Sequence, residues 1–275
     1  MKSKPAKPFV KWAGGKYRIA DQLNSFKPKV FNRYFEPMVG SGGLFFSNPA
    51  KKAYLSDINS KLINTYKVIQ NQATLEELIH ELHLIKSITH SKDSYKQIRD
   101  EFNKDDVNYI NSAVYFIYLN KMCFNGLYRE NSKGHFNVPM GDKRTFSVDE
   151  DNLRSVSKVL QDIDIECHNY EDIKPKKGDF VYIDPPYIPL DKISFTKYSK
   201  NDFNRDEHIK LSEFCSELTE SGVYFMLSNS DTAESRDIYS SKERYIKSFL
   251  VQRNIASKAK NRKKVKELII TNYKI

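Results

Sequence analysis

Short runs rich in Phe, Tyr, Val and Ile recur along this chain, and Gly, Pro or Asn bounds each of them, which is the pattern of β-strands. The five runs are Arg33 to Val39, Lys52 to Asp57, Asp179 to Asp184, Gly222 to Ser228 and Glu267 to Tyr273. Each of the first four ends in a polar turn, which suits parallel strands whose C-terminal ends form a binding site. The pattern therefore predicts an α/β fold.

The middle of the chain has a different periodicity. Between Asn59 and about Asn103, apolar residues recur three to four positions apart, and a further helix is predicted from Ile110 to Leu119. With 275 residues the chain can hold two domains and bury a sizeable core. We expect a sheet domain built from residues 1–60 and 146–275, interrupted by a helical insertion over residues 61–145.

Charge indicates the class of partner. Lys and Arg number 45 against 35 Asp and Glu, and the net charge of +10 favours a polyanion, with nucleic acid first and an anionic membrane second. A hydrophobic content of 39% argues against a disordered basic tail, and no apolar run is long enough to span a membrane. The segment Arg253 to Lys266 holds seven basic residues and no acidic one, and we expect Lys263 and Lys264 to contact nucleic-acid phosphates.

Other classes of site find little support. The first ten residues do not resemble a signal peptide, and the three Cys form no Cys-x-x-Cys pair, so we expect a cytoplasmic protein with reduced thiols. His80 and His83 do not match the zinc pattern, and no metal site is predicted. Lys16 is followed by Tyr17 instead of Ser or Thr, which excludes a phosphate-binding P-loop.

A glycine-rich loop follows the first predicted strand. Gly40, Gly42 and Gly43 allow the backbone to pass close to a ligand, because glycine has no Cβ and tolerates positive φ. Asp57, at the end of the next strand, is placed to accept hydrogen bonds from ribose hydroxyls. The two features together predict a ligand that contains adenosine.

The third strand ends in Asp184-Pro185-Pro186-Tyr187. Two prolines remove two backbone donors, so the main chain presents carbonyl oxygens beside the Asp184 carboxylate. Tyr187 adds a flat aromatic face. This set can accept two hydrogens from an exocyclic amine while a ring stacks on the base that carries the amine.

These motifs, and the order in which they occur along the chain, resemble those of the Dam-like group of adenine-N6 DNA methyltransferases. The resemblance runs from Phe9 to Tyr273 and includes the segment from Lys11 to Lys16. The segments from Asn120 to Arg129 and from Phe136 to Pro139 resemble the recognition hairpin of enzymes that methylate GATC. The resemblance implies a Rossmann-like mixed sheet of seven strands, and a target adenine flipped out of double-stranded DNA.

The resemblance also implies site residues. The methyl donor of the family is S-adenosylmethionine, and the residues that match its site are Trp12, Lys16, Glu36, Pro37, Gly40, Gly42, Asp57 and Asp184. The catalytic positions are Asp184, Pro185, Pro186 and Tyr187. The positions that extrude or read bases, or belong to the hairpin, are Lys11, Phe124, Asn125, Leu127, Arg129, Asn137 and Pro139. Arg129 is also suited by chemistry to the guanine O6 and N7 edge, and Phe124 is suited to wedge between base steps.

Several alternatives remain open from the sequence. Methylation of adenine at another short sequence, or of cytosine N4, uses similar chemistry, although cytosine-N4 enzymes usually have Ser at the position of Asp184. A non-catalytic DNA-binding relative would not require the intact tetrapeptide, and enzymes acting on RNA or protein glutamine more often begin it with Asn. Covalent cytosine-C5 chemistry needs a Cys that generally follows Pro, and none does. No protein partner is apparent, and both a stand-alone enzyme and one paired with a restriction nuclease fit.

Overall fold

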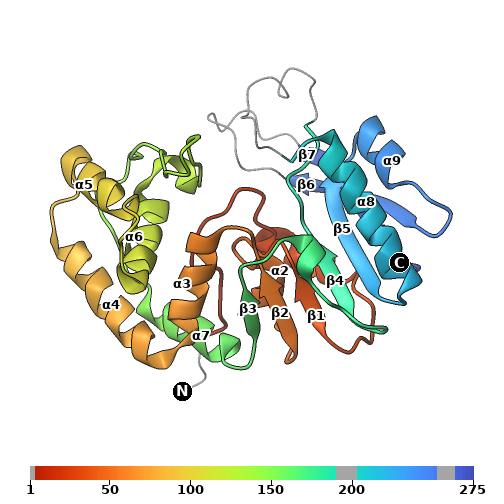
Figure 1. The fold of residues 1–275 in the computed structure, drawn as a ribbon, viewed down its shortest axis with the longest axis horizontal. Coiled ribbons are helices and arrows are strands. Elements are labelled where there is room, and N and C mark those ends of the chain that lie inside the picture. Colours follow the sequence, from red (N-terminus) through yellow and green to blue (C-terminus); the bar gives the residue numbers. More distant parts are fainter. Residues whose placement is uncertain (1–3, 190–202, 253–263) are drawn as a thin grey trace. The chain divides into compact units, whose positions relative to one another are not determined.

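The structure, a computed structural model, describes residues 4–189, 203–252 and 264–275. The strands in this part of the chain are β1 (Tyr34–Glu36), β2 (Ala53–Ser56), β3 (Asp164–Glu166), β4 (Phe180–Ile183), β5 (Tyr224–Ser230), β6 (Tyr245–Gln252) and β7 (Lys264–Thr271). They form one seven-stranded sheet in the order β3-β2-β1-β4-β5-β7-β6 (Figure 1). β4 runs parallel to β1 and to β5, whereas β7 is antiparallel to β5 and β6. The expected mixed α/β sheet is confirmed.

The strand order places a topological switch between β1 and β4. The chain passes from β1 to β2 and β3 on one side of the sheet and then returns to β4 on the other side of β1. Tyr34 lies opposite Phe180, and Phe35 opposite Val181, so both strands end at the same edge. Ligands of open α/β sheets bind at the carboxyl ends of strands at such a switch. Glu36 ends β1 and Asp184 follows β4 at this position.

Most of the described helices follow a residue whose side chain caps their first turn. They are α1 (Ala20–Asn24), α2 (Gly43–Ser47), α3 (Ser60–Gln70), α4 (Gln72–Ser87), α5 (Lys92–Phe102), α6 (Tyr109–Met122), α7 (Glu150–Leu160), α8 (Arg205–Glu220) and α9 (Ala233–Tyr239). Asn71, for example, ends α3 and accepts hydrogen bonds from the first amides of α4. Among the helices described here, none has both the length and the apolar character needed to cross a membrane.

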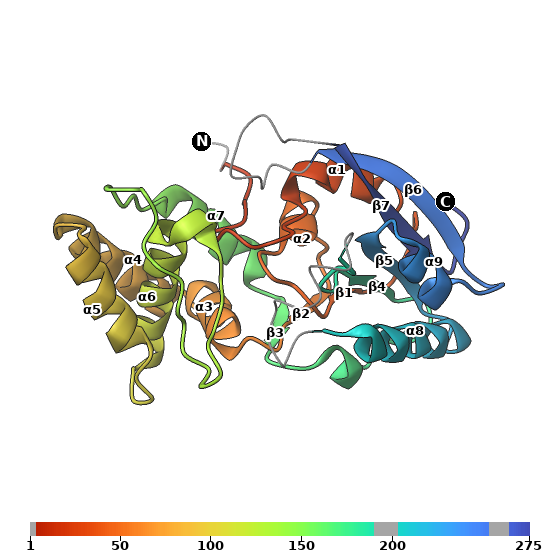
Figure 2. The same cartoon turned by 90° about the horizontal axis from the view of Figure 1, so that it is seen from above.

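The chain divides into two compact units. The first contains residues 1–21, 39–51 and 55–168, and the second contains residues 22–38, 52–54 and 169–275. In the first unit, α6 packs against α3, α4 and α5, and lies between α5 and α3 in both views (Figures 1 and 2). Helix α6 is buried nearly all round, including Phe116 and Tyr118, which explains why its apolar residues fill several faces. The predicted boundaries near residues 60 and 146 stay a prediction.

The second unit has its core between the sheet and α8. Leu211 and Leu218 of α8 belong to the same buried cluster as Phe225 and Leu227 of β5. Figure 2 shows α8 along one face of β4 and β5. All four residues of β4 are buried, as expected for a central parallel strand.

Candidate active site

Hydrogen bonds within the first unit fix the loop that follows β1. The Gly40 amide donates to Oδ2 of Asp57 at 3.0 Å, and the Tyr66 hydroxyl donates to the Gly40 carbonyl oxygen at 3.0 Å. Gly40 and Gly42 have φ of 47° and 65°, in the left-handed region that favours glycine. A Cβ on Gly42 would lie 2.8 Å from the ring of Phe46 and 2.8 Å from the Tyr66 hydroxyl. Backbone conformation and space therefore both require glycine here.

Asp57 fixes this loop through hydrogen bonds, and its carboxylate oxygens can still accept hydrogen bonds from a ligand. Its Oδ1 accepts the amide of Asn59 at 3.0 Å and its Oδ2 accepts the amide of Gly40. Burial raises the pKa of Asp57, and the hydrogen bonds from backbone amides oppose that rise. A carboxylate has about four lone-pair sites, so its oxygens can accept further bonds from ligand hydroxyls.

Trp12 packs on the glycine loop and against the helical insertion. A Cβ added to Gly40 would lie only 2.5 Å from Cδ1 of the Trp12 ring. The ring centroid lies 5.6 Å from that of Tyr128 and 6.4 Å from that of Phe116, and both pairs are stacked with an interplanar angle of 24°. Trp12 is half-buried. It is thus a fixed aromatic wall that retains some access to solvent.

Lys16 is an interior residue, although an isolated lysine in a sequence is usually assigned to the surface. Its exposed fraction is 6%, and Nζ donates to the Gly14 carbonyl oxygen at 2.6 Å. A Cβ on Gly43 would lie 2.7 Å from the Tyr17 amide nitrogen and 3.0 Å from that of Lys16. The glycine loop and the segment from Trp12 to Tyr17 are therefore closely packed.

Glu36, at the end of β1, is a buried carboxylate in the second unit. The Tyr34 hydroxyl donates to its Oε2 at 2.6 Å. Burial lowers the pKa of Lys27 to about 8, and the charge of Glu36 opposes this change. Pro37, which follows, is also buried. Lys27 was not among the predicted site residues, because it lies in a loop without a recognisable motif.

The tetrapeptide after β4 is held by the neighbouring strand. The Ser228 hydroxyl donates to Oδ1 of Asp184 at 2.7 Å, and the Tyr182 hydroxyl lies 3.1 Å from that of Ser228. Pro185 is buried and Pro186 is exposed. The sequence predicted Asp184, Pro185 and Pro186 but not Ser228, because only the strand register reveals that contact.

Tyr187 is anchored through its hydroxyl group. It donates to Oε2 of Glu267, on β7, at 3.0 Å. Just beyond it, the Ile188 amide donates to Oδ1 of Asn229 at 3.1 Å. Burial, followed by the charges of Asp184 and Glu267, raises the pKa of Tyr187 well above its usual value, so the hydroxyl keeps its proton. The ring is half-buried and its orientation is fixed at the hydroxyl end.

The predicted recognition hairpin has two distinct faces. Glu130 and Phe136 form an antiparallel bridge, and the Asn137 amide donates to the Arg129 carbonyl oxygen at 3.1 Å. On one face, the rings of Tyr128 and Phe136 lie 5.5 Å apart. On the other face, Nε of Arg129 donates to Oδ1 of Asn137 at 2.7 Å. One face of the hairpin is therefore packed through aromatic rings, whereas the other face carries the hydrogen-bonded side chains of Arg129 and Asn137.

The turn before the hairpin brings together Lys11 and the segment from Phe124 to Gly126. The Lys11 amide donates to Oδ1 of Asn120 at 2.8 Å, and Nδ2 of Asn120 donates to the Lys11 carbonyl oxygen at 2.8 Å. The stem of the Lys11 side chain fills the space beside Gly126, where a Cβ would lie 2.4 Å from it. Phe124 is 46% exposed, and Asn125 has a φ of 56°, in the left-handed region.

Two further hairpin residues lie beside this turn. The Phe124 amide donates to the Pro139 carbonyl oxygen at 2.9 Å, and the Leu127 amide donates to the Phe124 carbonyl oxygen at 3.3 Å. Leu127 is half-buried and Pro139 is exposed. Lys263 lies outside the described residues, and Lys264 is the first residue of β7.

The predicted residues therefore fall into three groups. The first unit brings together Trp12, Lys16, Gly40, Gly42 and Asp57, and separately brings Lys11 together with the hairpin. The second unit contains Glu36, Pro37 and the tetrapeptide from Asp184 to Tyr187. Sequence reasoning did not single out the supporting side chains Tyr34, Tyr66, Asn120, Ser228 and Glu267. Of these, Asn120 alone lies in a recognised motif, at the start of the hairpin segment.

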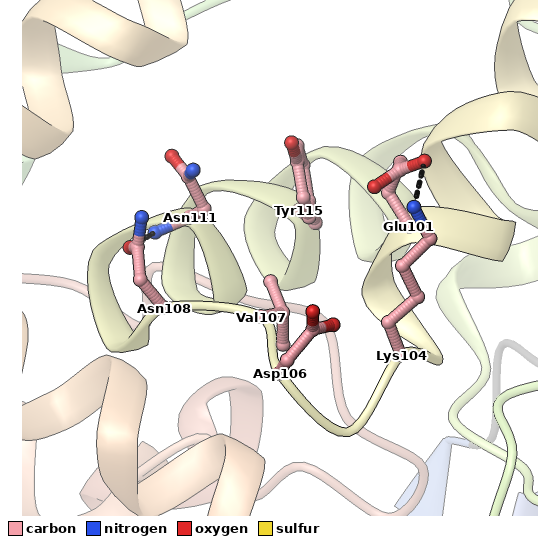
Figure 3. A pocket seen from close by; sticks show the side chains of 7 residues that line it. All are labelled: Glu101, Lys104, Asp106, Val107, Asn108, Asn111 and Tyr115. Carbon is pink, nitrogen blue, oxygen red and sulfur yellow. Dashed lines mark hydrogen bonds and ion pairs between the residues drawn. The ribbon is translucent and has the colours of Figure 1, made fainter.

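A hollow of about 240 Å³ lies elsewhere in the first unit, at the connection between α5 and α6 (Figure 3). Its lining residues are Glu101, Lys104, Asp106, Val107, Asn108, Asn111 and Tyr115, and none is a predicted site residue. Figure 3 shows the Nζ of Lys104 paired with Glu101, at 2.7 Å. None of its lining residues belongs to the glycine loop or to the hairpin.

The chain was compared with known proteins. A family model described as D12 class N6 adenine-specific DNA methyltransferase matches residues 12–255. The chain is 40% identical to the type II methyltransferase M.MjaIII of Methanocaldococcus jannaschii, covering 97% of this chain and 99% of that protein. It is 36% identical to the type II methyltransferase M1.LlaDCHI of Lactococcus lactis subsp. cremoris, covering 97% of this chain and 95% of that protein. It is 35% identical to the DNA adenine methylase of Escherichia coli K12, covering 97% of this chain and 95% of that protein.

The family model covers residues 12–255, and each of these three relatives matches 97% of the chain. The chain belongs to the D12 class of N6 adenine-specific DNA methyltransferases.

Proposed function

We propose that this protein transfers the methyl group of S-adenosylmethionine to N6 of an adenine that is rotated out of double-stranded DNA, within the sequence GATC. The observation that carries the proposal is the tetrapeptide from Asp184 to Tyr187 at the end of β4, beside β1 at the switch in strand order. The E. coli relative is named a DNA adenine methylase, which supports the same substrate.

The residues of the glycine loop fit S-adenosylmethionine. Asp57 can accept hydrogen bonds from ribose hydroxyls, and the glycines leave room for close approach of the ligand to the backbone. Lys16 provides an interior cation for a carboxylate, and Glu36 provides a buried anion for an ammonium group. Trp12 supplies the aromatic wall. When bound, S-adenosylmethionine supplies a methyl group on a positively charged sulfur.

The tetrapeptide is suited to the amine of adenine. The amine is a weak nucleophile because its lone pair is delocalised into the ring. The Asp184 carboxylate and the Pro185 carbonyl oxygen can accept its two hydrogens, which favours a more tetrahedral nitrogen with an available lone pair. Tyr187 offers a ring for stacking, held at its hydroxyl by Glu267. The proton can leave to solvent after transfer, so Asp184 need not be the final base.

The turn at Phe124 is suited to replace or displace the extruded base. An aromatic ring that is 46% exposed, on a turn fixed by hydrogen bonds, can insert between base steps. Leu127 and Pro139 lie beside it, and Lys11 is tied to the same turn through Asn120. We propose that this group contacts the target base pair and its neighbours.

Arg129 and Asn137 are the proposed readers of sequence. The hydrogen bond between them orients the guanidinium group, which can then present two donors to the O6 and N7 of guanine. The resemblance of this hairpin to those of GATC enzymes supports GATC as the target. Lys263 and Lys264 are proposed to contact phosphates, and residues 61–145 to form the target-recognition domain.

Transfer of labelled methyl groups to duplexes tests the proposal. The wild-type protein is incubated with labelled S-adenosylmethionine and duplexes that contain GATC, each single-base variant of it, or GATC with N6-methyladenine already in place. We expect transfer only to unmethylated GATC, and none by Asp184→Ala. The matched control Asp172→Ala replaces an aspartate that caps a surface 3-10 turn, and it should keep the wild-type rate. Absence of transfer by the wild type would refute the activity, and equal transfer to all variants would refute the specificity.

A further inference from the structure

The strand register brings a serine of β5 next to the proposed catalytic carboxylate. β4 and β5 are parallel, with Ile183 opposite Leu227, so the next pair along the register is Asp184 and Ser228. The Ser228 side chain is completely buried, and its hydroxyl donates to Oδ1 of Asp184 at 2.7 Å. A hydrogen bond to a carboxylate at this distance is of the strong, charge-assisted kind.

The carboxylate determines the direction of a longer chain of hydrogen bonds. A carboxylate only accepts, so the single hydroxyl hydrogen of Ser228 is directed to Asp184. In the 3.1 Å contact between Ser228 and Tyr182, the serine oxygen must therefore accept from the tyrosine hydroxyl. Burial, with the nearby charge of Asp184, raises the pKa of Tyr182 well above its usual value, so this donor stays protonated.

We propose, given the methyl transfer assigned above, that Ser228 is a positioning residue that holds the Asp184 carboxylate in the orientation needed to accept the adenine amine. The terminal torsion of an aspartate is broad, and Asp184 is only half-buried at the end of its strand. The bond from Ser228 restricts that torsion, and Tyr182 in turn fixes the rotation of the Ser228 hydroxyl. Pre-arranged acceptors cost no reorganisation when the reaction occurs.

Rates of a single turnover, measured with enzyme in excess over duplex, test this role. Ser228→Ala removes the donor, and we expect the rate of methyl transfer to fall roughly 10- to 100-fold, the effect of losing a hydrogen bond to a charged group. The dissociation constant for the GATC duplex should change less than about twofold, because Ser228 is assigned no contact with DNA.

Two further substitutions separate the hydrogen bond from packing. Ser228→Cys fills the space of the hydroxyl with a slightly larger thiol that is only a weak donor, so its rate should stay near that of Ser228→Ala. Tyr182→Phe removes the outer donor and should slow transfer about three- to tenfold. The double variant of Ser228→Ala and Tyr182→Phe should be no slower than Ser228→Ala alone, since Tyr182 acts through Ser228. Ser155→Ala removes a buried hydroxyl bonded to the Asp151 carbonyl oxygen of α7, and serves as the control with the wild-type rate.

The outcomes are distinct. A wild-type rate for Ser228→Ala, or recovery of the rate by Ser228→Cys, would overturn the positioning role while leaving the proposed function intact. A wild-type protein that transfers no methyl group would overturn both. If Ser228→Ala does not fold, Tyr182→Phe decides alone, and an unchanged rate in that variant would refute the chain of hydrogen bonds.

Discussion

Replacement of Gly40 by alanine tests whether the glycine loop and Trp12 form one site. The new Cβ would lie 2.5 Å from Cδ1 and 2.8 Å from Nε1 of Trp12, which is closer than real contacts allow. Gly40 also has a φ of 47°, where a side chain costs about 1–2 kcal/mol. Displacement of the indole would further weaken its stacks on Tyr128 and Phe116, each worth about 0.5–1.5 kcal/mol. We therefore expect Gly40→Ala to destabilise the fold by about 2–5 kcal/mol.

Gly134 provides a matched control. Its φ of 74° is also positive, but a Cβ there would meet nothing within 4 Å. Gly134→Ala should therefore incur only the backbone cost of about 1–2 kcal/mol. The difference between the two variants isolates the clash with Trp12.

Trp12 itself supplies the assay, because it is the only tryptophan in the chain. In Gly40→Ala its emission should move to longer wavelength as the ring leaves its stacks, and the dissociation constant for S-adenosylmethionine should rise about two- to tenfold. Gly134→Ala should match the wild type in both measurements. Identical emission spectra and affinities for the two variants would refute the reasoning that Gly40 exists to admit the Trp12 ring.

Three further predictions concern recognition and stability. Arg129→Ala should reduce discrimination at one guanine of the target by about 1–3 kcal/mol. Arg144, whose guanidinium donates to the Gly141 and Lys143 carbonyl oxygens, is the control, and Arg144→Ala should leave discrimination unchanged. Methyl transfer to single-base variants of GATC measures the discrimination of each variant. Burial lowers the pKa of His208 from 6.5 to about 4, so the unfolded state binds more protons between these values. Neutral His208 therefore contributes fully to the free energy of unfolding above about pH 6.5, and this contribution, about 3 kcal/mol, is lost as the pH falls towards 4. Denaturation of His208→Gln should show a smaller loss of stability over the same pH range. Neutralising Lys263 and Lys264 should weaken binding to all duplexes and flatten the dependence of affinity on salt, and an unchanged salt slope would argue against phosphate contact.

Much of the sheet could be predicted because its central strands are buried on both faces. β4 and β5 correspond to the predicted runs from Asp179 and Gly222, since continuous apolar sequence between turn residues is distinctive. The sequence did not reveal β3, which has only three residues, or β6. β6 is an edge strand in which Tyr245 and Leu250 are exposed and Lys247 interrupts the apolar pattern.

Candidate site residues could be chosen from the sequence where chemistry demands particular residue types, but not where one side chain only supports another. Asp184 and the glycines around Gly40 stand out because few residues can replace them. Ser228, Glu267 and Asn120 are polar residues of common type, and their roles depend on strand register and on contacts between segments far apart in the chain. Lys16 was assigned to the cofactor site only by resemblance, and its burial could not be predicted because it depends on tertiary packing that no local pattern records.

The aromatic and polar faces of the hairpin divide its residues into those that are needed for packing and those that could be substituted to change sequence specificity. Tyr128 and Phe136 belong to the aromatic packing that reaches Trp12, whereas Arg129 and Asn137 point to the opposite face, as alternation along paired strands requires. On the roles proposed above, a library that randomises only the polar face would sample new target sequences without disturbing the proposed aromatic wall of the cofactor site. Substitutions at the aromatic positions would alter both functions at once, so enzymes of new specificity should be sought among variants that retain those rings.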